Sequence, residues 1–110
     1  MVIGIGVDIE EIKEFRKSIS QKRFVSLLFT KREIAYCQKK KEPWISFAGK
    51  FCAKEAVVKA VFSKLKMKEI EIINQKNGKL VVFIQGKKMK KIFCSISHMK
   101  THAMAFVIVD

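Results

Sequence analysis

Branched apolar residues alternate with small or acidic ones along residues 2–8, and this alternation predicts a β-strand. Ile3, Ile5 and Val7 share one face, whereas the other face carries only glycine until Asp8 at its end. A face without side chains permits another backbone, or a ligand, to approach closely. We therefore expect Asp8 to stand beside a tightly packed or ligand-binding surface.

Three short helices are predicted between residues 10 and 40. Apolar residues recur at helical spacing over residues 10–19 and again around residues 24–28. Thr30 and Glu33 have the form of a capping box, which starts a third helix running to about Lys40. The first strand therefore leads into a helical layer.

A longer helix is expected from about Ile45 to Lys66, and its two sides differ in composition. Large apolar side chains form one stripe, and small ones cover much of the other side. A helix of this kind packs on both faces, so it should be the central helix of the domain. The large set is Phe47, Phe51, Val58, Phe62 and Leu65, and the small set is Ala53, Ala56 and Ala60.

The C-terminal part reads as strands. Ile70 and Ile72 lie in one strand, Asn77-Gly78 signals a hairpin turn, and residues 80–84 return. Residues 87–91 form a short helix or a solvated loop, and residues 92–97 and 103–109 form another strand pair. The fold class is α+β, a mostly antiparallel sheet packed on a long central helix, in a single domain of residues 1–110.

The N-terminal sequence and the cysteine spacing indicate where in the cell the protein lies and whether its thiols are paired. The N-terminus lacks the basic region of a signal peptide, and no stretch reaches the roughly 20 apolar residues of a membrane span. We therefore expect a cytoplasmic protein with no membrane contact. Cys37, Cys52 and Cys94 show no C-x-x-C spacing, so free, mostly buried thiols are expected rather than a zinc site or disulfides.

Charge points to an acidic partner. The 23 lysine and arginine residues outnumber ten acids, which gives a formal net charge of +13. Nucleic acid, anionic lipid, a phosphorylated small molecule and an acidic protein would each be attracted to such a surface. A lysine-rich proteome would leave the same signature without any partner.

Two carboxylates and two lysines are the candidate chemistry. Glu55 and Lys59 stand four apart in the order that favours a structural helical ion pair. Asp8 is either a cap for the following helix or, with Glu55, a ligand of Mg²⁺, which takes one or two carboxylates plus substrate phosphates. In the second case Lys54 and Lys59 would offset phosphate charge. Both interpretations remain open from the residues alone.

Other motifs are weaker. Gly4-x-Gly6 lacks the third glycine of a dinucleotide-binding fingerprint. His98 and His102 are four apart, but they flank a turn and no third metal ligand is near them in sequence. The G-x-S-x-G motif of a nucleophile elbow does not occur.

Three segments, in order, resemble a known family. They are "GIGVDIEEI" at 4–12, "GKFCAKEAVVKA" at 49–60 and "SISHMKTHAMAFVIV" at 95–109, with "NGKL" at 77–80 resembling a hairpin in which proline usually replaces Leu80. The combination of G-x-D-I with F-x-A-K-E-A-x-x-K-A is specific, and the likeness covers nearly the whole chain. The chain is similar to holo-acyl-carrier-protein synthases, the small 4′-phosphopantetheinyl transferases of fatty acid biosynthesis.

The resemblance implies an activity and an assembly. A serine hydroxyl of an acidic apo acyl carrier protein attacks the β-phosphate of coenzyme A in a Mg²⁺-dependent reaction. Phosphopantetheine moves to the serine, and adenosine 3′,5′-bisphosphate leaves. Members of this type are homotrimers with sites between subunits.

The resemblance also assigns residues. Asp8 and Glu55 match the metal-binding acids, Lys59 a phosphate-contacting lysine, and His98 a histidine near the nucleotide. Arg23 matches a basic position that docks the carrier. Further positions are less direct. Lys54, which precedes Glu55, would be a cofactor contact, as would Lys50, which replaces the usual arginine as a nucleotide contact. Arg16, near Arg23 in the chain, would also bind the carrier, and Glu10 shares the strand face of Asp8 and would reach the metal only through water.

Two alternatives to an active transferase follow from the same residues. A basic nucleic-acid-binding domain would explain the charge, although the strands show no interleaved aromatic platform. A catalytically inactive trimeric scaffold of the same fold is the other, and the intact set of Asp8, Glu55 and Lys59 argues against it. The interpretation favoured is therefore the enzyme, with no nucleic-acid partner.

Overall fold

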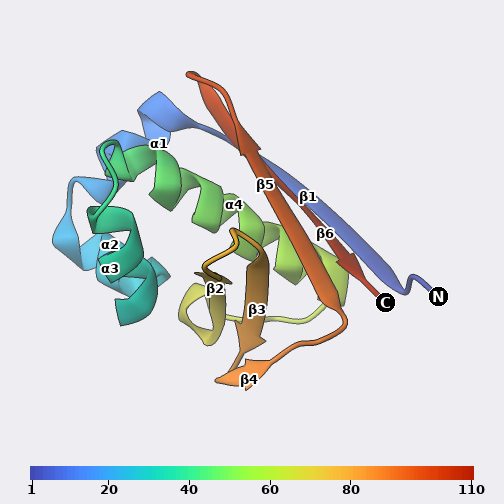
Figure 1. Ribbon diagram of the computed structural model, residues 1–110. Helices are drawn as coiled ribbons and strands as arrows, with labels where there is room; N and C mark the ends of the chain where they lie inside the picture. The colour runs from blue at the N-terminus through green and yellow to red at the C-terminus, as the bar shows by residue number, and fades with distance from the viewer.

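The computed structural model describes residues 1–110, and helices and strands follow one another in a mixed order (Figure 1). The elements are β1 (Gly4–Glu11), α1 (Ile12–Ile19), α2 (Lys22–Leu28), α3 (Lys31–Gln38), α4 (Pro43–Val61), the 3₁₀ helix η1 (Met67–Glu69), β2 (Ile70–Asn74), β3 (Leu80–Ile84), β4 (Lys87–Lys88), β5 (Ile92–His98) and β6 (His102–Val109). The capping box of Thr30 and Glu33 is present at the start of α3, as the sequence predicts.

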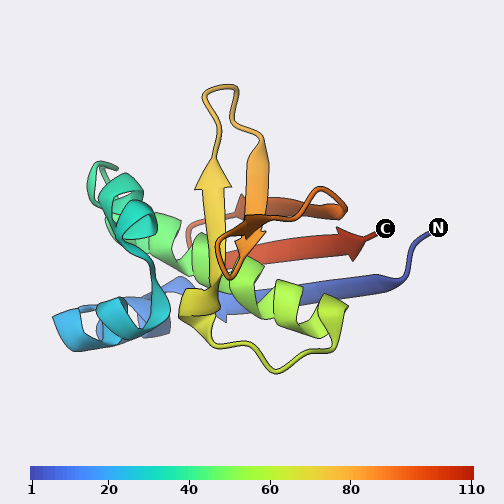
Figure 2. The same cartoon turned by 90° about the horizontal axis from the view of Figure 1, so that it is seen from below.

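The strands form two three-stranded sheets, in the orders β1-β6-β5 and β2-β3-β4, and every pairing is antiparallel. Helix α4 runs through the middle of the molecule, with the first sheet along one side and α1–α3 gathered near its N-terminal end (Figures 1 and 2). The predicted α+β fold, with antiparallel strands packed on a long central helix, is therefore confirmed.

The glycine face of β1 is covered by the backbone of α4. A Cβ atom added at Gly4 would lie 2.0 Å from the carbonyl oxygen of Ala60, and one added at Gly6 would lie 2.0 Å from that of Ala56. Glycine is therefore required at both positions, because any side chain would push the helix off the strand. The close approach expected from the sequence is made by a helix backbone rather than by a ligand.

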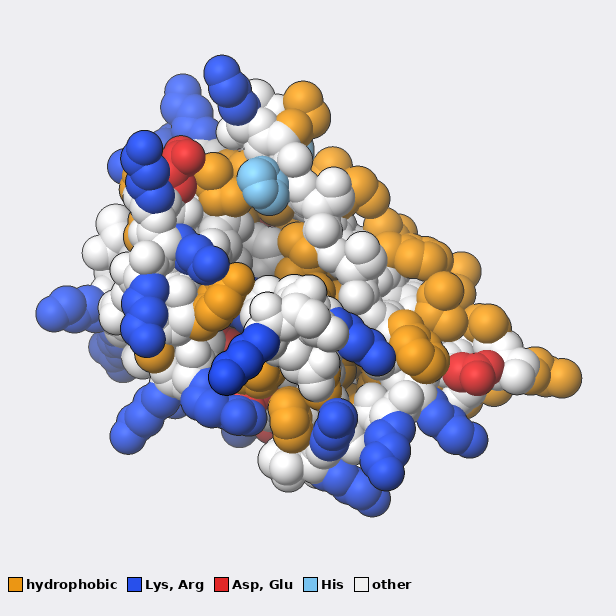
Figure 3. All heavy atoms as spheres, viewed as in Figure 1, with side chains coloured by type: hydrophobic (Ala, Val, Ile, Leu, Met, Phe, Trp, Pro, Cys, Tyr) orange, Lys and Arg blue, Asp and Glu red, His pale blue; other side chains and the backbone are white.

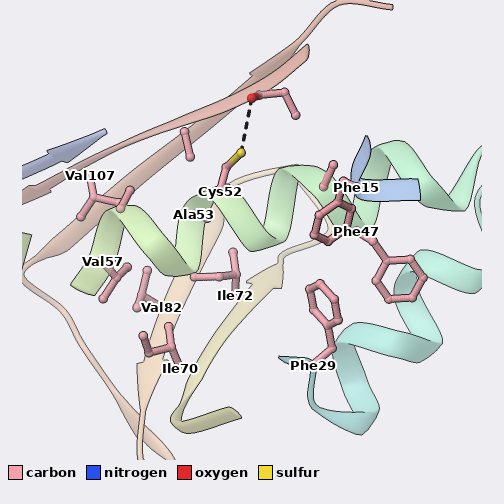
Figure 4. Packing of buried hydrophobic residues seen from close by; sticks show 14 of the residues in the cluster. Phe15, Phe29, Phe47, Cys52, Ala53, Val57, Ile70, Ile72, Val82 and Val107 are labelled. Carbon is pink, nitrogen blue, oxygen red and sulfur yellow. Dashed lines mark hydrogen bonds between the residues drawn. The ribbon is translucent and has the colours of Figure 1, made fainter. Parts of the chain in front are cut away.

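Aromatic side chains fill the space between the N-terminal half of α4 and the short helices (Figure 4). The ring centroids of Phe15 and Phe51 are 5.1 Å apart, and those of Phe29 and Phe47 are 4.9 Å apart. Burial of such large side chains is the main stabilising contribution in a domain of this size. The phenylalanines at 47 and 51 therefore occupy the packed face that the helical pattern predicted.

The prediction fails at the end of the same helix. The chain leaves α4 at Phe62, which adopts a left-handed backbone conformation with φ of 54° and is 84% exposed. Phe62 is therefore not part of the packed apolar stripe, whereas Leu65, which lies beyond the end of the helix, still packs against the core. The segment 87–91 is also different from either predicted form, because Lys87–Lys88 pair with β3 as a short strand.

The cysteines are free thiols, as predicted, with Cys37 and Cys52 buried and Cys94 partly buried. Burial raises the pKa of each thiol to about 12, so none is a thiolate at neutral pH. None of the helices combines the length and apolar composition that crossing a membrane requires.

Candidate active site

The packing of β1 on α4 brings the two predicted acids together. The strand and the helix run in opposite directions, with Gly4 beside Ala60 and Gly6 beside Ala56. Two strand residues and four helix residues each advance about 6 Å, so Asp8 falls near the next turn of α4. The negative charge of Asp8 is accordingly felt by both Cys52 and Glu55 on that turn.

Asp8 has one carboxylate oxygen with a cationic neighbour and one without any partner. Its Oδ1 lies 3.4 Å from Nζ of Lys59, which also donates a hydrogen bond of 2.9 Å to the carbonyl oxygen of Val7. Its Oδ2 is buried and accepts no hydrogen bond. A buried carboxylate oxygen without a partner is costly, and a bound cation would relieve that cost.

The pKa values of two further carboxylates, Glu10 and Glu55, are raised by burial and by the nearby charge of Asp8. Burial, followed by the charge of Asp8, raises the pKa of Glu55, while Lys59 opposes the shift. Burial and then Asp8 also raise the pKa of Glu10 from 4.5 to about 7, with a further contribution from Glu55. Groups with raised pKa values that repel one another form a site of excess negative charge, which is typical of cation-binding and catalytic positions.

The donor set fits Mg²⁺ bound together with a substrate. No three His, Cys, Asp or Glu side chains converge as a complete metal cage. Mg²⁺ is usually held by one or two carboxylates, with waters and phosphate oxygens filling the remaining positions. The unpartnered Oδ2 of Asp8 and the nearby Glu55 carboxylate meet that requirement, and Glu10 is the third acid of the group.

The raised pKa values give a pH dependence with a definite sign. Because Glu10 has a higher pKa in the folded protein than its ordinary value, the metal-free protein should lose stability as pH rises through about 7. A bound cation neutralises the repulsion, so the rise in melting temperature produced by Mg²⁺ should be larger at pH 8 than at pH 5.5. Thermal melts with and without Mg²⁺ at the two pH values measure this, and an equal stabilisation would contradict it.

Two alternatives from the sequence are wrong in the folded protein. Lys59 makes its contacts with β1, at Val7 and Asp8, and no ion pair with Glu55 is formed. The residue that precedes α1 as its N-cap is Glu11, whose side chain makes no capping hydrogen bond, so Asp8 is not a helix cap. Neither structural role therefore accounts for the two acids.

A separate cleft of about 260 Å³ contains two of the predicted cofactor-binding residues, Lys50 and His98. Its wall also includes Asn74 and Gly78 from the β2–β3 hairpin, together with Tyr36. The Nζ atom of Lys50 donates to Oδ1 of Asn74 at 2.7 Å and to the carbonyl oxygen of Ile72 at 2.6 Å. The sequence carried no signal for Asn74, because its partner is 24 residues away.

Burial affects the charge of this lysine. Lys50 is only 3% exposed, and burial lowers the pKa of its ammonium group. Hydrogen bonds to two oxygen acceptors nevertheless favour the protonated form, so the cleft has a fixed cation in its wall. An anionic group of a ligand would be attracted to this position.

The prediction that Lys54 binds the cofactor by offsetting phosphate charge does not fit the structure. Its side chain is completely buried, and its Nζ lies 2.5 Å from Oε1 of Glu33 on the side of α4 that faces the other helices. The helix places residues 54 and 55 about 100° apart around its axis, so Glu55 faces β1 while Lys54 faces the interior. Lys54 is therefore a structural residue, and this prediction is corrected.

The two predicted docking arginines lie on exposed helices. Arg23 is at the start of α2, and the guanidinium carbon of Arg16 in α1 lies 3.6 Å from the centroid of the Trp44 ring. Such a cation–π contact holds the arginine in place while its donors remain accessible to a partner. The two side chains are available to an acidic partner.

Comparison with known proteins defines the class. Residues 4–107 match the family model of the 4′-phosphopantetheinyl transferase superfamily. The chain belongs to this superfamily. It is 40% identical, over 122 aligned positions covering 100% of the chain and 97% of the relative, to the holo-[acyl-carrier-protein] synthase of Clostridium tetani. It is 41% identical to the synthase of the same description from Protochlamydia amoebophila, with 98% of each chain covered.

Solved structures agree on the fold. The holo-(acyl-carrier-protein) synthase of Bacillus anthracis in complex with CoA (3′,5′-ADP) matches with a TM-score of 0.85 at 30% identity, covering 99% of this chain and 96% of that one. The synthase of Helicobacter pylori in complex with coenzyme A matches with a TM-score of 0.83 at 27% identity, covering 96% and 99%. The resemblance noted in the sequence motifs is therefore confirmed.

Proposed function

We propose that this chain is a holo-[acyl-carrier-protein] synthase, which transfers the 4′-phosphopantetheine group from coenzyme A to a serine hydroxyl of an apo acyl carrier protein. The observation that carries the proposal is the unpartnered, buried Oδ2 of Asp8 beside Glu55 and Lys59. The relatives that match over nearly their whole length are named holo-[acyl-carrier-protein] synthases, and two solved structures of such synthases contain coenzyme A or its 3′,5′-ADP part. These names and complexes support coenzyme A and the acyl carrier protein as the two substrates.

Different residues would bind the metal ion, the phosphate groups and the nucleotide of coenzyme A during the transfer. Bound Mg²⁺ would supply Lewis-acid stabilisation of charge on the pyrophosphate, and Asp8 and Glu55 would hold it. Lys59 offers an ammonium group, about half exposed, that would contact a phosphate oxygen as negative charge develops. The cleft with Lys50 and His98 would take the nucleotide end of coenzyme A, so that adenosine 3′,5′-bisphosphate is the leaving group.

A direct assay tests the activity. The protein is incubated with coenzyme A, Mg²⁺ and an apo acyl carrier protein, and the carrier is analysed by mass spectrometry for the added phosphopantetheine. A serine-to-alanine carrier is the matched control and should remain unmodified. Absence of the modification with several apo carriers, at neutral pH and millimolar Mg²⁺, would refute the function.

An exposed apolar face supports the proposal of a homotrimer. Side chains of β1 and β6 that point away from α4 are mostly hydrophobic, as is Phe93 on β5, and Figure 3 shows hydrophobic atoms along the edge where β1 and β6 lie. An apolar area of this extent usually marks a protein interface. The exposed residues of this face are Ile3, Ile5, Val7, Ile9, Phe93, Met104 and Phe106.

A homotrimer has a defined mass in solution, and a substitution on the exposed apolar face should dissociate it. Light scattering at micromolar concentration should give three times the chain mass of 12.7 kDa. Ile5→Asp should shift the protein to monomer, because burial of an unpaired carboxylate at an interface is strongly unfavourable. Phe62→Asp, at a position that is equally apolar and more exposed but off this face, should leave the mass unchanged. A monomeric wild-type protein with full activity would contradict the trimer.

Basic residues around α2 support docking of an acidic carrier. Exposed cations gather on the first three helices, and charge complementarity of this kind speeds and orients association. Arg23→Glu should therefore raise the KM for the carrier while leaving the KM for coenzyme A unchanged, and added salt should have the same effect. These cations include Arg16, Lys17, Lys22, Arg23, Lys31 and Arg32.

A second charge reversal serves as the control. Lys88→Glu makes the same change of charge on β4, in the sheet β2-β3-β4 and not on the helices that carry the proposed docking residues. It should leave the KM for the carrier unchanged. Equal effects of the two variants would mean that net charge alone matters. Specific competition by duplex DNA at physiological salt would favour the nucleic-acid-binding alternative, for which the net charge of +13 is the supporting observation. A cytoplasmic location stays a prediction.

A further inference from the structure

Glu33 and Lys54 form an ion pair inside the protein. Both side chains are 0% exposed, and Nζ of Lys54 lies 2.5 Å from Oε1 of Glu33. The same ammonium group donates to the carbonyl oxygen of Leu28 at 2.7 Å and to that of Met67 at 3.0 Å. An ammonium group has three protons, so all of its hydrogen-bonding capacity is used.

The Glu33 carboxylate is equally well bound. Its Oε1 accepts a hydrogen bond of 2.9 Å from the backbone N–H of Thr30, and its Oε2 accepts one of 2.8 Å from the backbone N–H of Ile72. The ion pair therefore joins α4 to the end of α2, the start of α3, η1 and the strand β2. Three stretches of the chain, around residues 28–33, 54 and 67–72, therefore meet at these two side chains.

A buried ion pair usually adds little to the free energy of unfolding. Removal of both charges from water costs free energy that their attraction roughly offsets, and apolar residues of similar size are often as stabilising. Hydrogen bonds to fixed backbone atoms, in contrast, specify distance and direction, whereas apolar packing tolerates sliding and rotation. The pair therefore contributes chiefly to geometry.

The geometry that it fixes is that of the proposed site. Lys54 directly precedes Glu55, so anchoring one side chain in the interior sets the rotation of α4 that directs the other toward Asp8. The carbonyl oxygen of Leu28 ends α2, the helix that carries Arg23. The ammonium group of Lys54 thus contacts the docking helix, and the residue that carries it directly precedes the metal-binding acid Glu55 in the chain.

We propose that the buried Glu33–Lys54 ion pair is a positioning device that holds the Glu55 carboxylate against Asp8 and fixes the carrier-docking helix α2 relative to the metal site. The two residues act through others and touch no substrate. The inference rests on the proposed function, because it assigns Glu55 to the metal and α2 to the carrier.

The test removes both charges while preserving size. In Glu33→Gln/Lys54→Met the glutamine amide oxygen still accepts a hydrogen bond, and no lone charge is left buried. Mn²⁺ binding, measured by electron paramagnetic resonance in the presence of coenzyme A, should weaken about tenfold, the usual scale for residues that orient a metal ligand. The KM for the carrier should rise, and the KM for coenzyme A should stay unchanged.

Two further variants separate positioning from stability. Val82→Ala creates a cavity at a fully buried position that makes none of these hydrogen bonds, and it should lower the melting temperature without weakening Mn²⁺ binding. Glu33→Asp keeps the charge but shortens the side chain, so the protein should fold with an intermediate loss of Mn²⁺ affinity. If either folded variant at position 33 binds Mn²⁺ and the carrier as the wild type does, the proposal is overturned. Failure of the wild type itself to bind Mn²⁺ and modify the carrier would instead refute the function.

Discussion

Replacement of Asp8 by asparagine, or of Glu55 by glutamine, is expected to lower the turnover number by about 100-fold or more, the scale for loss of a group that stabilises transition-state charge. Each change is isosteric and removes one negative charge from the site where Oδ2 of Asp8 is buried without a partner. Transfer of phosphopantetheine to the carrier, followed at saturating Mg²⁺, measures the effect.

The stability of these variants provides an internal check. The charge of Asp8 raises the pKa values of Glu10 and Glu55, and that of Glu55 raises the pKa of Glu10, so removing the charge of Asp8 or Glu55 should leave the melting temperature of the metal-free protein unchanged or higher. Glu11→Gln is the matched control, because Glu11 is an exposed acid on the same strand without a side-chain capping bond. Near-normal turnover of either site variant in Mg²⁺ would remove that residue from the proposed site.

Replacement of Gly6 by alanine is expected to lower the free energy of unfolding by about 3 kcal/mol or more, at the upper end for overpacking. The added Cβ would lie 2.0 Å from the carbonyl oxygen and 2.9 Å from the carbonyl carbon of Ala56. These are backbone atoms in a helix and cannot rotate away, so α4 itself must move. Urea denaturation of both proteins measures the difference.

Gly78→Ala is the control for a simple glycine effect. Gly78 has φ of +88° and no atom within 4 Å of an added Cβ, so alanine there should cost only about 1 kcal/mol of left-handed backbone strain. The displacement of α4 predicts a second difference, since Gly6→Ala should also weaken Mn²⁺ binding and Gly78→Ala should not. Equal destabilisation by the two substitutions would show that β1 and α4 are not in the close contact described.

Local features were read reliably from the sequence because their causes are local. Alternation along β1, the capping box before α3 and the Asn77-Gly78 turn each depend on residues within a few positions of one another. The motifs around Asp8 and Glu55 were also sufficient to indicate the family. The glycine face even predicted a close approach, although it did not say what would approach.

The roles of the lysines were decided only by the tertiary structure. Lys54 and Lys59 both stand near Glu55 in the sequence, but helical geometry separates them around the axis by about 140°, so one meets Glu33 in the interior and the other meets Asp8 on β1. Which side of α4 would face which layer depends on contacts with distant residues, such as Glu33 for Lys54 and Asp8 for Lys59. No local pattern encodes such contacts.

The same reason explains the other differences. Lys50 donates a hydrogen bond to Asn74 on a separate hairpin, and Phe62 lies outside the core because α4 ends at Val61 rather than near Lys66, as the apolar stripe suggested. The raised pKa of Glu10 likewise comes from burial and from charges on another element as well as its own. The sequence by itself determined most of the elements and the family, and it singled out Asp8 and Glu55 as candidate acids, because these follow from short-range patterns. Only the tertiary structure decided which charged groups face one another, because burial and charge pairing depend on how distant segments pack.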